Sequence, residues 1–250
     1  MRQVDLNVDV GEGAGNDYEL LQYVTSANIA CGAHAGGEQT MRVTVARAVE
    51  LGVAIGAHPG HADREHYGRR ELPLTPAQAK SLVAEQLERL MRVVDRRNGR
   101  LAYLKPHGAL YHQLARCPKL AEAAVRAAVE AGPPLAVLGP AGSCLEAAAR
   151  EAGTPFFAEA FADRAYLSNG EIAPRSHPGA LFEDESEVVR QALSLATRRA
   201  VTTADGGCLS VPCDSICLHG DTRWAVEFAA GVRLALARRG VRVESFAGRC

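Results

Sequence analysis

TPAQAKSLVAEQLERLMRVVDRRNGRLAYLK, at residues 75–105, predicts one helix followed by one strand. Apolar residues recur at i, i+3 and i+4 from Thr75 to Arg97, which is the pattern of an amphipathic helix. Thr75 and Gln78 have the spacing of a capping box, and Asn98-Gly99 marks the C-terminal end of the helix. The LAYLK run that follows predicts a buried strand, so this unit consists of a helix, a glycine and a strand.

The same unit recurs along the chain. Glycines precede four further apolar runs: Gly52 before VAIGAH, Gly132 before PPLAVLG, Gly153 before TPFFAEAF and Gly240 before VRVESF. With VDLNVDV, ANIAC and SICLHG, the chain has eight candidate strands. Apolar strands between helices indicate a parallel sheet with both faces covered. Because polar residues follow nearly every strand, we expect a distorted (β/α) barrel of seven or eight strands and not a doubly wound sheet.

Length and composition fit a single barrel domain over residues 1–250. The chain has 250 residues, and 47% of them are hydrophobic. The formal net charge is -1 and the basic residues are scattered, which argues against nucleic acid or a membrane as a partner. No apolar run reaches the roughly 20 residues of a membrane span, and the first residues show no signal-peptide pattern. We therefore expect a cytoplasmic protein.

The cysteines predict reduced thiols. Their number, 7, is odd, and a chain of this size needs no disulfide staples. Cys208, Cys213 and Cys217 lie close together with His219 behind them, but their spacing is not that of a zinc ribbon. We expect these three thiols to be buried and to bind no metal.

Two predicted connections, residues 59–74 and residues 161–183, are longer than the usual loop between a strand and a helix. Each follows a candidate strand directly. Long loops in a compact domain are usually functional, so we expect both to act as lids or as partner-docking segments.

Polar and charged side chains gather on the strands and at their ends. Alternation places Asp5, Asn7 and Asp9 on one face of the first strand, with Glu12 in the following turn. The later strands carry or lead to Asn28, His34, His58, Lys105, His107, Glu159, Asp163, Arg164, His219 and Asp221. In a β/α barrel the C-terminal strand ends meet at one mouth, where active sites are built. We therefore expect one pocket in which Asp9, His34, His58, Lys105, His107 and His219 converge.

Several catalytic motifs are absent from the sequence. No G-x-x-x-x-G-K-[ST] motif surrounds any lysine, which excludes a P-loop ATPase. No G-x-S-x-G elbow occurs, and no cysteine lies in a recognisable nucleophile signature. General acid–base catalysis by carboxylates and histidines remains, with or without a metal.

Blocks along almost the whole chain resemble the signature blocks of the LamB/YcsF family. They are DLNVDVGEG at 5–13, SANIACGAHAGG at 26–37, GVAIGAHPG at 52–60, YGRR at 67–70, KPHGALYH at 105–112, EAFADRAY at 159–166 and LHGD at 218–221. The resemblance implies a barrel of the glycoside hydrolase/deacetylase kind. It also implies the A component of a three-component, ATP-dependent 5-oxoprolinase, which opens 5-oxo-L-proline to L-glutamate and needs subunits B and C. ATP, with Mg²⁺, is the cofactor implied.

Within that function, we expect the following roles. Asp9 or Glu12 acts as the base on the attacking water, and His58, His107 and His219 move protons. Lys105 and Arg164 hold the carboxylate of the substrate or the phosphate. The remaining residues expected to bind the substrate are Asp5, Asn7, Asn28, His34, Arg70, Glu159, Asp163 and Asp221.

Two other functions stay open at the level of sequence. A metal-dependent deacetylase or amidohydrolase acting alone would use Asp5 or Asp9 and two histidines as ligands. The histidines are dispersed in the sequence, whereas deacetylases of this superfamily usually have two ligand histidines close together, so no metal ligand is assigned. A non-catalytic, ligand-binding subunit is the third possibility.

Overall fold

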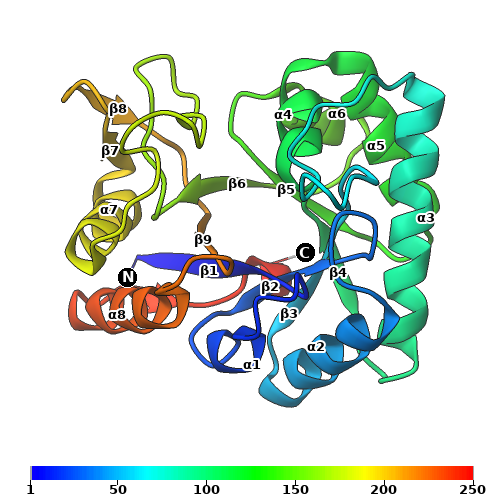
Figure 1. Cartoon of the computed structure of the whole chain (residues 1–250), viewed down its shortest axis with the longest axis horizontal. Coiled ribbons are helices and arrows are strands. Elements are labelled where there is room, and N and C mark those ends of the chain that lie inside the picture. Colours follow the sequence, from blue (N-terminus) through cyan, green and yellow to red (C-terminus); the bar gives the residue numbers. More distant parts are fainter. Residues whose placement is uncertain (1, 250) are drawn as a thin grey trace.

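A closed parallel barrel forms the centre of the protein, as a computed structural model that describes residues 2–249 shows (Figure 1). Within these residues, seven strands form the ring in the order β1-β2-β3-β4-β5-β6-β9, and β9 pairs with β1 to close it. The ring strands are β1 (Gln3–Val10), β2 (Ser26–Ala30), β3 (Ala54–His58), β4 (Leu101–Leu104), β5 (Ala136–Gly139), β6 (Phe156–Phe161) and β9 (Ser215–His219). The predicted barrel is therefore confirmed.

The eighth predicted strand lies outside the ring. β10 (Arg242–Val243) is parallel to the start of β1, where Gln3 pairs with Arg242. Within the described residues, it pairs only with Gln3 and Val4 at the start of β1. It takes no part in the closure, because β2 and β9 pair with the rest of β1. The eight predicted strands thus all form.

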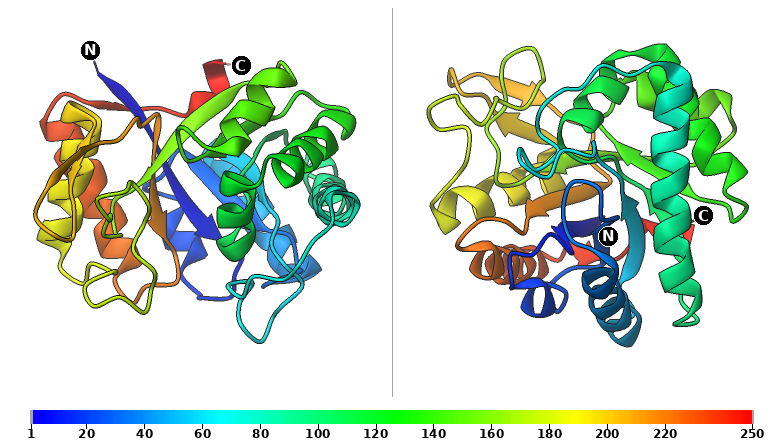
Figure 2. Two further views of the ribbon diagram at one scale, coloured as in Figure 1. Left: turned by 90° about the horizontal axis from the view of Figure 1, so that it is seen from above. Right: turned by 45° about the vertical axis from the view of Figure 1, so that its right-hand side comes forward.

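Helices surround the barrel and cover its outer face (Figure 2). They are α1 (Asp17–Leu20), α2 (Glu38–Leu51), α3 (Pro76–Asp95), α4 (Gly108–Arg116), α5 (Pro118–Glu130), α6 (Cys144–Glu151), α7 (Glu185–Arg198), α8 (Ala225–Arg238) and the 3-10 helix η1 (Phe246–Arg249). The main apolar core lies between these helices and the strands. Among the helices of residues 2–249, none combines the length and the apolar character needed to cross a membrane.

Helix α3 shows how local sequence fixes the elements. Thr75 accepts from the backbone N–H of Gln78, and the Gln78 side chain accepts from the backbone N–H of Thr75, so the predicted capping box is present. The helix ends at Asp95, and Asn98 then takes a left-handed conformation with φ of 51°. Asparagine tolerates this conformation better than most residues, which explains the sharp turn into β4.

One hairpin was not predicted. Between α7 and β9, β7 (Ala200–Thr202) and β8 (Cys208–Ser210) form an antiparallel pair outside the barrel. Cys208 is exposed on this hairpin, so the prediction that it is buried was wrong. Cys213 and Cys217 are buried as predicted.

Both predicted long loops are present. The first connects β3 to α3 through residues 59–75, and the second connects β6 to α7 through residues 162–184. The second loop folds back on itself through isolated bridges between Arg164 and Leu181 and between Tyr166 and Ile172. Each loop contributes side chains to the pocket at the barrel mouth.

Candidate functional site

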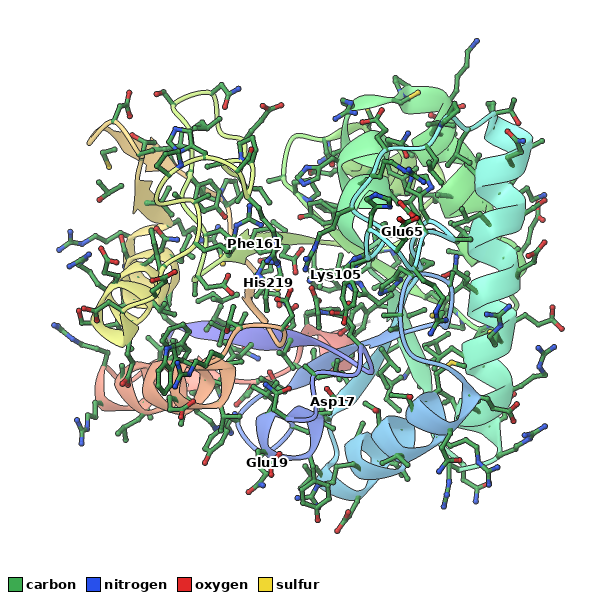
Figure 3. The ribbon with its side chains drawn as sticks, in the orientation of Figure 1. Asp17, Glu19, Glu65, Lys105, Phe161 and His219 are labelled. Atoms are coloured by element: carbon green, nitrogen blue, oxygen red, sulfur yellow. The ribbon has the colours of Figure 1, made fainter. Side chains whose placement is uncertain are left out.

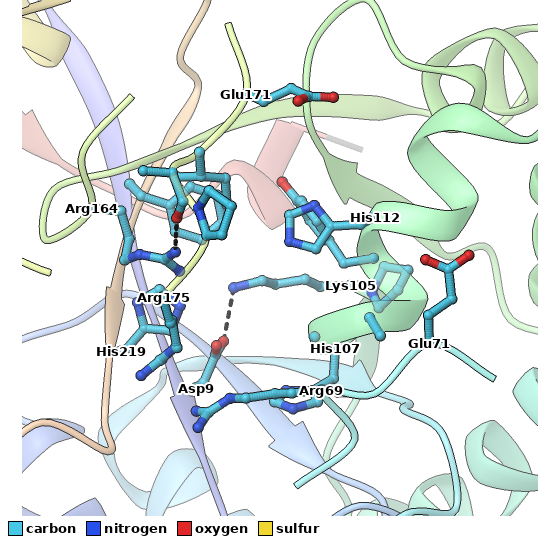
Figure 4. A pocket seen from close by; sticks show the side chains of 18 of the residues that line it. Asp9, Arg69, Glu71, Lys105, His107, His112, Arg164, Glu171, Arg175 and His219 are labelled. Carbon is cyan, nitrogen blue, oxygen red and sulfur yellow. Dashed lines mark hydrogen bonds and ion pairs between the residues drawn. The ribbon is translucent and has the colours of Figure 1, made fainter. Parts of the chain in front are cut away.

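A pocket of about 410 Å³ opens at the C-terminal ends of the ring strands (Figure 4). Its polar groups and its concave shape are typical of a small-molecule site. Six of the predicted site residues line it: Asp9, His58, Lys105, His107, Arg164 and His219. The sequence therefore identified the correct end of the barrel, while the chemical roles of these residues stay predictions.

Beneath the pocket, polar side chains fill the barrel interior. Asn28 donates to Asn7 Oδ1 at 2.7 Å and to Asp9 Oδ1 at 2.8 Å. Asn7 in turn donates to Ser215 Oγ at 2.7 Å, and the Tyr103 hydroxyl donates to Asn28 Oδ1 at 2.7 Å. Asn7 and Asn28 are fully buried and do not line the pocket. They were expected to bind the substrate, but in the structure the Asn28 amide holds Asp9 and Asn7 holds Asn28.

Asp5 lies still deeper and does not reach the pocket either. Its carboxylate accepts from Thr25 at 2.8 Å, from Ser26 at 2.6 Å and from Ser215. Alternation along β1 correctly placed Asp5 and Asp9 on one face, but a side chain four residues before the mouth is too far down the barrel. Asp5 thus has a structural environment and no access to a ligand.

Burial raises the pKa of Asp5 to about 6, above its ordinary value of 3.8. The folded protein therefore holds this proton more tightly than the unfolded chain, so stability that is present below pH ~4 is lost as the pH rises to ~6. Asp5→Asn removes this titration. Relative to the wild type, the free energy of unfolding of the variant should rise by about 2 kcal/mol between pH ~4 and pH ~6. Urea unfolding at both pH values measures the change, and a difference independent of pH would contradict it.

Lys105, which Figure 3 labels, forms a buried ionic cluster with the carboxylates of Asp9 and Glu159. The Lys105 ammonium lies 2.8 Å from Asp9 Oδ1 and 2.8 Å from Glu159 Oε1. It also lies 3.3 Å from Asn7 Oδ1 and 3.1 Å from Cys217 Sγ. Burial alone would lower the pKa of Lys105, but Asp9, Cys217 and Glu159 together outweigh burial and keep it well above its usual range. This geometry favours a lysine that neutralises carboxylates over one that holds the substrate.

Backbone carbonyls fix the tautomers of two histidines in the pocket. His58 Nδ1 lies 2.8 Å from Lys105 O, and His107 Nε2 lies 2.8 Å from Tyr67 O. Because a carbonyl only accepts, each of these nitrogens carries the proton. Burial, followed by the neighbouring His34 and His58, holds the pKa of His107 well below its usual range. His107 Nδ1 therefore presents a lone pair toward His58 Nε2, 3.0 Å away.

Two carboxylates bring further acceptors to the same place. Asp9 Oδ2 lies 3.4 Å from His58 Nε2, and Glu12 Oε1 lies 3.3 Å from His107 Nδ1. The ligand atoms of Asp9, His58 and His107 lie within 4.8 Å of one another, and so do those of Glu12, His34 and His107. Three acceptor atoms thus converge on His58 Nε2, and a proton on this nitrogen or a bound cation would satisfy them. We call Asp9, Glu12, His58 and His107 the acceptor cluster.

His34 and the first long loop support the acceptor cluster. The His34 ring stacks on His107 with ring centres 3.8 Å apart, and His34 Nε2 lies 3.1 Å from Glu12 Oε1. Tyr67 has a φ of 57° and places its carbonyl against His107 while its hydroxyl donates to Glu12 O. Next to it, a Cβ on Gly68 would lie 2.7 Å from the Cβ of His34, so only glycine fits there.

His219 forms a separate pair with Asp163 at the edge of the pocket. Asp163 accepts from the backbone N–H of His219 at 2.8 Å and lies 3.0 Å from His219 Nδ1. Burial alone would raise the pKa of Asp163, but His219 outweighs burial and lowers it. Asp163 thus fixes the tautomer of His219 and leaves Nε2 as the acceptor. Asp163 acts through His219 in this arrangement and does not line the pocket itself.

Arginines on the pocket rim were mostly missed by the sequence. Arg69 and Arg175 line the pocket and both pair with Asp221. Arg70, which was expected to bind the substrate, pairs instead with Asp63 outside the pocket. Two adjacent arginines in YGRR cannot be told apart without the loop conformation, and residues 171–175 carry no motif.

Tyr111 and His112 also line the pocket and were not assigned a role from sequence. Both lie on α4 within the KPHGALYH block, one helical turn after Gly108. Residues three and four apart share one face of a helix, so the spacing of Gly108, Tyr111 and His112 was a usable signal.

Comparisons with known proteins agree with the fold and identify the family. The profile of the LamB/YcsF family matches residues 4–249. The crystal structure of a lactam utilization protein from Thermus thermophilus has 40% sequence identity and a TM-score of 0.90, covering 98% of this chain and 100% of that one.

More distant structures share the fold alone. A peptidoglycan deacetylase from Bacillus subtilis has 10% identity and a TM-score of 0.52, covering 99% of this chain and 89% of that one. A polysaccharide deacetylase from Bacillus cereus has 14% identity and a TM-score of 0.50, covering 98% of this chain and 92% of that one. The profile match spans nearly the whole chain, and the protein therefore belongs to the LamB/YcsF family.

Proposed function

We propose that this chain is the A component of a three-component, ATP-dependent 5-oxoprolinase. With subunits B and C it would cleave 5-oxo-L-proline to L-glutamate while ATP is hydrolysed to ADP and phosphate. The observation that carries the proposal is the acceptor cluster facing a small-molecule pocket, in a chain similar to a lactam utilization protein.

Coupling to ATP suits the chemistry of the substrate. An unactivated lactam resists hydrolysis, and glutamate can close back to the ring. Phosphorylation of the amide oxygen would make the ring carbon more electrophilic, so that water can attack it. The ring nitrogen must then gain a proton as the C–N bond breaks, and a second water must hydrolyse the resulting γ-glutamyl phosphate to glutamate and phosphate.

The acceptor cluster supplies groups suited to these proton transfers. The lone pair of His107 Nδ1 and the Glu12 carboxylate can take a proton from the attacking water. Asp9 is the weaker base: burial would raise its pKa, but His58 and Lys105 outweigh burial and hold it well below its usual range. His219, oriented by Asp163 at the edge of the pocket, can take a proton on Nε2, and Asp163 would stabilise the imidazolium that then donates this proton to the leaving nitrogen.

Release of glutamate from 5-oxo-L-proline tests the proposal. We expect release only when the chain, subunits B and C, ATP and Mg²⁺ are all present, with ADP formed in parallel. Omission of ATP and omission of this chain are the controls. If no combination that includes this chain forms glutamate, the proposal is wrong.

The acceptor cluster also supports a second candidate, a metal-dependent amide hydrolase that acts alone. The ligand atoms of Asp9, His58 and His107 meet within 4.8 Å, although these residues are dispersed in the sequence. Neutral imidazoles and a carboxylate are common zinc ligands, so the residues fit a divalent cation. Such an ion would lower the pKa of a bound water. Asp9 Oδ2, His58 Nε2 and His107 Nδ1 are the atoms that would hold it.

Metal analysis separates this candidate from the first. The purified chain would be stripped with a chelator, incubated with Zn²⁺, desalted and measured by elemental analysis. The candidate predicts about one bound ion in the wild type and loss of binding in His58→Asn. His112→Asn, a pocket histidine outside the cluster, is the matched control. Absence of bound metal in the wild type removes this candidate and leaves the ATP-coupled proposal intact.

A further inference from the structure

Arg164 is a buried cation without a carboxylate partner. Its residue is only 6% exposed, and its guanidinium donates to Ala180 O at 3.3 Å and to Ala173 O at 2.6 Å. Among residues 2–249, no carboxylate oxygen lies within the 4.0 Å of an ion pair with it. A buried charge is costly unless it is paired, and two neutral carbonyls offset only part of that cost. Although the charges of Asp163 and Asp221 act on Arg164 from further away, the pocket thus keeps on its wall a positive charge that no direct ion pair neutralises.

Two further guanidinium groups lie around Arg164. Arg69 and Arg175 line the same pocket, and within residues 2–249 both depend on one carboxylate, that of Asp221. Burial, followed by repulsion from Arg175 and Arg69, lowers the pKa of Arg164, as expected for like charges held near one another. Asp163, the nearest acid in sequence, uses both carboxylate oxygens for His219. Asp221 is therefore the one acid that forms ion pairs with any of these three arginines among residues 2–249.

We propose that Arg164, Arg69 and Arg175 form an oxyanion site that binds a carboxylate or phosphoryl group of the ligand. Guanidinium groups match the oxygen geometry of both. Asp9, His58 and His107 line the same pocket, so a ligand anchored by its anion can present its other end to them. The site selects lactams that carry an anionic group and rejects neutral ones. That substrate class rests on the proposed function, whereas the oxyanion site itself does not.

Binding of three probes to the purified chain tests the site by calorimetry. 5-Oxo-L-proline carries a carboxylate, 2-pyrrolidinone is the same ring without it, and inorganic phosphate represents a phosphoryl group. We expect 5-oxo-L-proline or phosphate to bind, and 2-pyrrolidinone to bind about tenfold to a hundredfold more weakly than 5-oxo-L-proline. If phosphate displaces 5-oxo-L-proline, both anions bind at the same site. Binding of 5-oxo-L-proline without such competition assigns the site to the carboxylate.

Glutamine variants of the three arginines show which of them contribute to binding of the anionic probe. Arg164→Gln should remove the preference for the anionic probe, and Arg175→Gln and Arg69→Gln should weaken it about tenfold each. Arg70→Gln is the matched control, because Arg70 neighbours Arg69 in sequence but pairs with Asp63 outside the pocket. If Arg164→Gln fails to fold, as its bonds to the second long loop allow, the two rim variants decide the question.

The outcomes that overturn the inference are distinct from those that overturn the function. Equal affinity for the anionic and neutral rings without phosphate binding, no binding of any probe, or unchanged preference in folded Arg175→Gln and Arg69→Gln would remove the oxyanion site. Anion binding through these arginines in a chain that supports no glutamate release would keep the site and remove the 5-oxoprolinase proposal.

Discussion

Lys105→Met is expected to lower the free energy of unfolding by about 3–5 kcal/mol. The substitution keeps the volume of the side chain but leaves the Asp9 and Glu159 carboxylates buried without their shared cation. The cost of an uncompensated buried charge exceeds the net gain that the pair provides, so the loss is large. Denaturant unfolding of both proteins at neutral pH measures it.

Lys119→Met is the control for Lys105→Met, because Lys119 is exposed on α5 and should be replaceable with little effect. Unchanged stability of Lys105→Met would show that the buried pairs contribute nothing. In that case Lys105 would be free for the role expected from sequence, which is to hold the substrate carboxylate or the phosphate, and loss of glutamate release in a stable variant would support it.

His107→Asn is expected to reduce ATP-coupled glutamate release by about a hundredfold to ten-thousandfold. Asparagine can still donate toward Tyr67 O, but it has no imidazole lone pair to offer at the position of Nδ1, which faces His58 and Glu12. The reconstituted three-component enzyme at saturating ATP provides the measurement. Thermal melting of the variant should remain close to that of the wild type.

His112→Asn is the matched control for His107→Asn, since His112 lies on the same helix and lines the same pocket but is not in the acceptor cluster. Equal turnover of His107→Asn and the wild type would exclude His107 from proton transfer. A large loss in both variants would indicate that the pocket as a whole, and not the cluster, had been disturbed.

Regular elements were readable from the sequence because their signals are local. The capping box of Thr75, the apolar period of α3 and the left-handed turn at Asn98 all lie within one segment. The β7–β8 hairpin could not be predicted from the sequence. Its strands are three residues each and largely exposed, so they lack an apolar pattern. Exposure of Cys208 follows from that omission.

The candidate site could be predicted only in part from the sequence. Which side chains reach the pocket depends on how far each lies below the barrel mouth and on the conformation of the loops. Strand alternation gives the face of Asp5 and Asp9 but not how far each lies below the mouth. The dispersed positions of His58 and His107 argued against a common ligand site, yet the closed ring brings their nitrogens within 3.0 Å. Likewise, only the path of the first long loop shows that Arg69 and not Arg70 faces the pocket.

Closure of the ring by β9 has a consequence for synthesis of the protein. Residues Asp5–Asp9 of β1 pair with Ser215–His219 of β9, a contact between the two ends of the sequence. Until the ribosome has released β9, β1 and β6 both expose an unpaired edge, and such edges promote aggregation of nascent chains. Contacts of such high sequence separation also slow folding. A chain that is paused or truncated before β9 should therefore aggregate unless chaperones bind it, even though it contains the sequence of every earlier helix and strand.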